Sequence, residues 1–67
     1  MTRDEVFKWC EERAAMPRQT VYNTENGHKE RYSNGDTYDF KYIKYDIREK
    51  VSQIFINGAM VLEQVTA

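Results

Sequence analysis

The sequence has few of the residues that build catalytic and metal sites. Its 67 residues include one Cys, one His, one Pro and three Gly. A single Cys excludes an internal disulfide, and one Cys with one His cannot supply the ligands of a zinc site. There is no run of about 18 apolar residues to span a membrane, and the charged start does not resemble a signal peptide. We therefore expect a cytoplasmic protein that has no metal or other cofactor and does not bind a membrane.

The sequence also lacks an excess of charge of one sign. Ten basic and eleven acidic side chains give a net charge of -1, and neither half of the chain forms a basic arm or an acidic tail. Binding that depends on phosphate neutralisation needs several Lys or Arg on one face, and the linear spacing provides no such cluster. The length predicts a single domain over residues 1–67, which buries only about 60% of the surface of its unfolded chain. We expect neither a deep pocket nor enzymatic activity.

The first segment has the pattern of an amphipathic helix over residues 3–16. Thr2 and Glu5 have the spacing of a capping box, in which each side chain binds an unpaired backbone N–H group. Apolar residues recur on one half of the helical wheel. Arg13 lies inside this apolar arc, and we expect its guanidinium to extend to the edge of the arc. Pro17 disfavours helical angles at the residue before it and so predicts the end of the helix.

All three glycines follow an asparagine, which is a strong signal for a β-hairpin turn. Runs of residues with high strand propensity lie between and beside these Asn-Gly pairs. The predicted fold is α+β, with the N-terminal helix packed on an antiparallel meander of four or five strands. The runs are residues 19–24, 28–33, 37–45, 51–56 and 59–65.

One segment fits two structures. Ile47, Val51, Ile54 and Phe55 recur at the spacing of a helical stripe, which predicts a second helix at about residues 47–56 before the last strand. The β-branched and aromatic residues here favour a strand, and an Asn-Gly pair with apolar residues on both sides favours a hairpin. We prefer the hairpin and keep the second helix as the alternative.

The residues that could support catalysis do not form a specific pattern. His28 follows a predicted turn, where we expect it to be exposed, and Ser33 and Asp36 could approach it across a neighbouring turn. Cys10 lies on the apolar stripe of the predicted helix, where a thiol is inert. We therefore predict no catalytic residues and no metal ligands.

Aromatic and basic residues alternate in the middle of the chain. Exposed aromatic side chains on a sheet can stack on the bases of single-stranded nucleic acid while nearby cations bind its backbone. This alternative function depends on five residues. They are Tyr32, Lys41, Tyr42, Lys44 and Tyr45.

The last predicted hairpin is apolar on both faces. A two-residue turn at Asn57-Gly58 pairs Phe55 with Met60, Ile54 with Val61 and Gln53 with Leu62. Because one helix covers only one face of a sheet, the other face needs another cover. We favour a second copy of the chain or another protein as this cover, and the alternative is that the N-terminal strand or the curvature of the sheet supplies it. The predicted interface residues are Ile43, Tyr45, Phe55, Met60 and Leu62.

The favoured hypothesis is a small, non-enzymatic protein–protein interaction module that forms a homodimer or binds another protein. Short chains without motifs are often accessory proteins, including inhibitors encoded by phages and other mobile elements. By analogy of size we expect such a role here.

Overall fold

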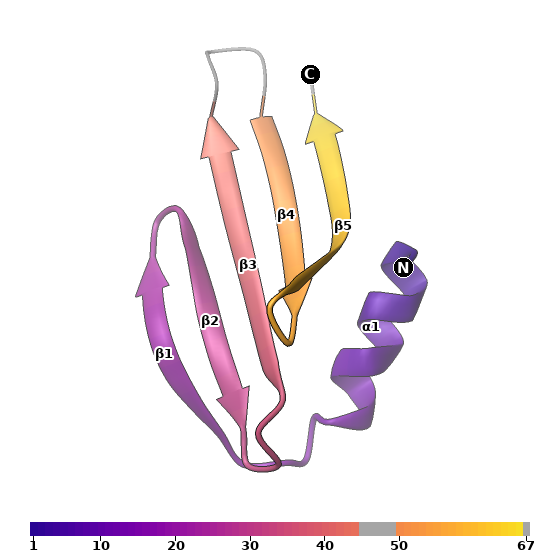
Figure 1. The fold of residues 1–67 in the computed structure, drawn as a ribbon, viewed down its shortest axis with the longest axis vertical. Helices are drawn as coiled ribbons and strands as arrows, with labels where there is room; N and C mark the ends of the chain where they lie inside the picture. The colour runs from indigo at the N-terminus through magenta and orange to yellow at the C-terminus, as the bar shows by residue number, and fades with distance from the viewer. Residues whose placement is uncertain (45–49, 67) are drawn as a thin grey trace.

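In the computed structural model, residues 1–44 and 50–66 are described, and they form one helix followed by five antiparallel strands (Figure 1). The strands follow the order of the sequence in one open sheet, with β1 and β5 as its edges. The α+β arrangement and the meander are confirmed, and the second helix is wrong for residues 50–56, which form a strand. Residues 47–49 lie outside the described residues. The elements are α1 (Arg3–Glu12), β1 (Arg18–Thr24), β2 (Gly27–Tyr32), β3 (Thr37–Lys44), β4 (Lys50–Ile56) and β5 (Ala59–Thr66).

The helix starts where the capping box predicts and ends earlier than the pattern indicates. The Glu5 backbone N–H donates to Thr2 Oγ1 at 3.2 Å, and the Thr2 N–H donates to Glu5 Oε1 at 3.0 Å. α1 ends at Glu12 instead of residue 16, because the chain tightens at Arg13, whose N–H donates to the Cys10 carbonyl at 3.1 Å. Residues 13–16 then lead the chain back toward the sheet. The chain is fixed to the end of β2 at Pro17, whose carbonyl accepts a hydrogen bond from the Ser33 N–H at 2.8 Å.

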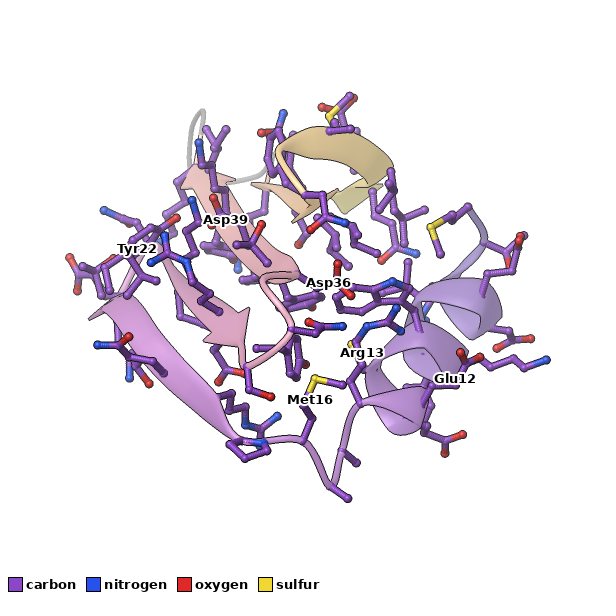
Figure 2. The ribbon with its side chains drawn as sticks, turned by 60° about the horizontal axis from the view of Figure 1, so that its bottom comes forward. Glu12, Arg13, Met16, Tyr22, Asp36 and Asp39 are labelled. Atoms are coloured by element: carbon purple, nitrogen blue, oxygen red, sulfur yellow. The ribbon has the colours of Figure 1, made fainter. Side chains whose placement is uncertain are left out.

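Arg13 connects the end of α1 to the sheet. Its Nε lies 3.0 Å from Asp36 Oδ2, and Asp36 belongs to the loop between β2 and β3. Its Nη1 donates to the Trp9 carbonyl at 3.0 Å, and its Cζ lies 3.9 Å from the centroid of the Trp9 ring. Figure 2 shows Arg13 and Asp36 pointing toward one another between α1 and the loop. The guanidinium is therefore held between the Trp9 ring and the Asp36 carboxylate, and the Arg13 side chain is only 20% exposed.

Trp9 packs on two aromatic rings of the sheet. Its ring meets Tyr32 edge-on, with centroids 5.5 Å apart, and stacks on Tyr38 at 6.5 Å. Aromatic pairs of this geometry add to the stabilisation from burial alone. The core is nevertheless thin. Its buried apolar residues among those described are Val6, Tyr32, Val51 and Ile56, and none of the described side chains is fully buried.

The turn between β4 and β5 has the predicted two-residue form. Asn57 and Gly58 adopt positive φ angles of 53° and 84°, as the tight turns of two-residue hairpins require. The turn is also bonded to the start of β3. The Asn57 N–H donates to the Thr37 carbonyl at 3.0 Å, and the Thr37 N–H donates to Asn57 Oδ1 at 2.9 Å.

The register of this hairpin differs from the prediction beyond the pair of Phe55 and Met60. Phe55 pairs with Met60 as predicted, but Ile54 pairs with Leu62 instead of Val61, because the register shifts between Ile54 and Phe55. Val61 is the extra residue of a β-bulge, a local insertion in one strand of a pair. The Val61 carbonyl accepts from the Met1 amino group at 2.9 Å. The bulge moves Leu62 to the face of Ile54, so the predicted pairing of Leu62 with Gln53 is wrong.

Gly27 is the first residue of β2, and the turn before it consists of residues 25–26. Its φ angle is 150°, and a Cβ atom built on it would lie 2.0 Å from the Phe40 carbonyl oxygen of β3. Only glycine allows the two backbones to approach so closely.

We predict that Gly27→Ala lowers the free energy of unfolding by more than about 1 kcal/mol, because it adds a clash to an unfavourable φ. Urea denaturation monitored by circular dichroism measures the loss. The control is Gly35→Ala, at a φ of 94° but with no atom within 4 Å of the added Cβ. A loss at Gly27 no larger than at Gly35 would contradict the role of the close approach.

We predict a second effect at Asp36, whose pKa is held below its ordinary value chiefly by the hydrogen bond from Arg13 and then by that from Asn34. A carboxyl whose pKa is lower in the folded state stabilises the protein above the unfolded pKa, about 4, and loses this contribution as the pH falls through the folded pKa. Asp36→Asn should therefore flatten the fall in melting temperature below about pH 4. Glu12→Gln, which removes an exposed carboxylate on α1, should leave that fall unchanged.

Candidate binding surfaces

The two faces of the sheet differ in what covers them. Because side chains alternate along a strand, the pairing of β2 to β5 places Glu30, Tyr38, Ile54 and Leu62 on the side that faces α1. We call this the helix-side face. The residues between them point to the opposite side, which we call the helix-free face. Figure 2 shows Tyr22 and Asp39 on that side, away from α1.

A groove lies between α1 and the helix-side face. Its volume is about 460 Å³, which is within the range of small-molecule sites. Val6, Phe7 and Cys10 line it from the helix, and Ile54 and Leu62 line it from the sheet. Phe7, one of these lining residues, is 68% exposed. An exposed phenylalanine at an apolar groove is typical of a surface that binds another molecule.

The charged groups at this groove are unequally paired. Arg18 Nη1 lies 3.4 Å from Glu30 Oε2, so these two charges neutralise each other. Arg3 lines the same groove, and no ion pair joins it to any side chain in residues 1–44 or 50–66. The described part of the groove therefore has one uncompensated positive charge.

His28 lies in β2 among aromatic rings of the helix-side face. Its ring centroid is 5.9 Å from those of both Tyr38 and Phe40, and the side chain is half-buried. The expectation of an exposed turn histidine is therefore wrong. Ser33 follows the opposite end of β2, about 16 Å away along an extended strand. Asp36 is bonded to Arg13, and the structure does not bring these residues together as a catalytic group.

Cys10 is half-buried in the groove wall. Burial raises the pKa of its thiol, and the negative charge of Glu30 raises it further. A protonated, half-buried thiol is a poor nucleophile and a poor metal ligand. Across the described ranges, no three His, Cys, Asp or Glu side chains are grouped as a metal site would require.

Polar side chains form a band across the helix-free face. The Tyr22 hydroxyl donates to Asp39 Oδ1, Lys41 Nζ lies 4.9 Å from the Phe55 ring centroid, and Gln53 Nε2 donates to Glu63 at 2.7 Å. The hydrogen bond to Asp39 raises the pKa of Tyr22 to about 12. Polar groups of both signs thus separate the apolar residues of this face.

The helix-free face includes three of the five predicted interface residues. Ile43, Phe55 and Met60 lie on it, and Met60 is 52% exposed. Leu62 lies on the helix-side face because of the bulge at Val61, and residue 45 is outside the described residues. The prediction omitted Val65, which shares this face and is 61% exposed. No signal in the sequence indicated this, because a strict alternation from Met60 places Val65 on the opposite face, and only the bulge at Val61 brings it to this one.

The five residues of the nucleic-acid hypothesis do not form one surface. Tyr32 is 3% exposed beneath the Trp9 ring, so it is not accessible for stacking on a base. Tyr42 and Lys44 lie on the helix-side face, while Lys41 lies on the helix-free face. Tyr45 lies outside the described residues.

Comparisons with known proteins give no match to a family model, a curated protein or a solved structure. Within residues 1–44 and 50–66, no helix has both the length and the apolar character needed to cross a membrane.

We predict that Asp39→Asn lowers the pKa of Tyr22 from about 12 toward the ordinary tyrosine value of about 10, since the acceptor loses its charge. The hydrogen bond stabilises the fold below pH 10, and this contribution is lost as the pH rises through 12. NMR titration of isotope-labelled tyrosine rings measures the change. Tyr38, whose pKa is raised chiefly by burial, is the internal control and should not move. An unchanged Tyr22 titration would contradict the assignment.

Proposed function

We propose that the protein is a non-enzymatic protein–protein interaction module that forms a homodimer through the helix-free face. The observation that supports this proposal is the surface the single chain leaves exposed. Its solvent-accessible area is 5018 Å². A compact monomer of 8.0 kDa is expected to expose about 4450 Å². The chain therefore exposes about 570 Å² more than its mass predicts.

The size of this excess is that of a small interface. Specific dimers bury about 600 Å² or more on each partner. The thin core supports the same interpretation, since among the described residues only four apolar side chains are buried. Association would supply part of the apolar burial that a chain of this length cannot achieve alone.

The composition of the helix-free face suits a two-fold interface. Phe55 and Met60 form one apolar pair on adjacent strands, and Val65 lies farther along β5. Lys41 and Glu63 lie on the same face with opposite charges. In a two-fold dimer the same patch meets itself, so a face with charges of both signs can place opposite charges across the interface.

Met60→Glu tests the dimer, because a charge in an apolar interface is costly to bury, while an exposed position tolerates it in the folded monomer. We expect wild-type protein to be a dimer at micromolar concentration and the variant to be a monomer with unchanged circular dichroism. Size exclusion with light scattering measures both.

Val21→Glu is the matched control, since Val21 is 45% exposed on β1 at the opposite edge of the sheet. This variant should remain dimeric. The apolar contact should also persist in molar salt, whereas phosphate-dependent binding would weaken steeply. A wild-type monomer at micromolar concentration, or equal dissociation by both substitutions, would contradict the proposed interface.

A further inference from the structure

The two edges of the sheet are unequally protected against an added strand. An edge strand presents unpaired backbone N–H and C=O groups, which bind another strand unless charge, proline or a bulge prevents it. On β1 the register is interrupted at Val21, in the middle of the strand, so the edge has no long regular stretch. On β5 the pairing with β4 is regular from Leu62 onward, and Leu62–Val65 contains neither proline nor lysine.

One carbonyl at the start of β5, that of the bulge residue Val61, already accepts a hydrogen bond from another part of the chain. The Met1 nitrogen donates to the Val61 carbonyl at 2.9 Å, which occupies the beginning of this edge. Figure 1 shows α1 beside the β5 end of the sheet, with no described element flanking β5 toward its C-terminal end. The single charge of Leu62–Val65, on Glu63, points to the helix-free face, where it is bonded to Gln53. The Glu63 charge therefore does not repel a strand whose side chains approach on the helix-side face.

The unprotected edge adjoins the groove beneath α1. Leu62 and Gln64 of β5 line the groove together with Arg3 and Phe7 of the helix. A strand added to β5 would lie about 4.8 Å from it, and every second side chain would point to the helix side. Those side chains would meet the exposed ring of Phe7 and the uncompensated charge of Arg3.

We propose that the β5 edge binds an extended peptide segment of a target protein by strand addition. The groove selects a segment with an apolar side chain and an acidic side chain two residues apart. The apolar group packs between Phe7 and Leu62, and the acidic group pairs with Arg3. This inference rests on the proposed function, since it gives the chemistry of the target that the interaction module binds.

The spacing of the helix agrees with this arrangement. Arg3 and Phe7 are four residues apart, which is about 6 Å along a helix. Alternate residues of a strand are about 6.7 Å apart. Main-chain hydrogen bonds to β5 would then supply affinity, and the two side-chain contacts would supply selectivity, as in other cases of strand addition.

The test uses two synthetic peptides of the same composition, titrated into the full chain and monitored by amide NMR. In Ser-Thr-Asp-Thr-Leu-Thr-Thr-Ser the acidic and apolar side chains share one face of a strand. In Ser-Thr-Asp-Leu-Thr-Thr-Thr-Ser they point to opposite faces. We expect the first peptide to bind more tightly, to shift the amides of Leu62–Val65 and to slow their hydrogen exchange. A version of the first peptide with N-methyl groups along its backbone should not bind.

Arg3→Glu should weaken binding of the first peptide at least about threefold, as expected for reversal of an exposed ion pair. Lys8→Glu makes the same charge change at an exposed position of α1 that does not line the groove, and should leave binding within about twofold. Equal binding of the two peptides, shifts confined to β1 or the helix-free face, or no binding at millimolar peptide would overturn the inference. Contacts between the β5 edges of two copies without peptide would also overturn it, since a second copy would then occupy the edge.

Light scattering on the same samples separates this inference from the proposed homodimer. A dimer that does not bind the peptide contradicts the strand-addition site alone. A monomer that binds the peptide contradicts the homodimer alone.

Discussion

The ion pair between Arg13 and Asp36 fixes where the helix can lie. Asp36 also accepts hydrogen bonds from Asn34 and Asn57, so one carboxylate joins the end of α1, the β2–β3 loop and the β4–β5 turn. The start of α1 is held by a second contact, the hydrogen bond from the Met1 amino group to the Val61 carbonyl of β5. The helix is thus attached to the sheet near both of its ends. A groove remains between these two points because the side chains of α1 do not fill the space beneath it.

Features of the fold that depend on neighbouring residues were predictable from the sequence. The capping box, the Asn57-Gly58 turn and the strand runs reflect backbone preferences within a few residues, and the structure contains all three. The end of the helix was not predictable. Residues 13–16 continue the helical pattern, but Arg13 bonds to a residue 23 positions away, and a local pattern has no information about such a partner.

The surfaces were predictable only in part, for the same reason. A strict two-residue alternation places Leu62 on the same face of the sheet as Phe55. The bulge at Val61 places Leu62 on the face of Ile54 instead. A single extra residue reverses the face of every position that follows it in the strand. Tyr32 was expected in an exposed aromatic set, but the Trp9 ring covers it, which only the packing of helix on sheet determines. Only the structure shows that Phe7 and Arg3 line the same groove.

The order of the strands has a consequence for how the chain folds. Every strand pairs with its neighbour in sequence, so each hairpin closes a short loop and extends the sheet by one strand. Such local pairings are associated with fast folding, whereas contacts between distant residues slow it. The contacts of greatest sequence separation belong to the N-terminal segment, through Met1–Val61 and Arg13–Asp36. The sheet can therefore assemble by successive hairpins, and docking of the helix is the step with the largest loop-closure cost.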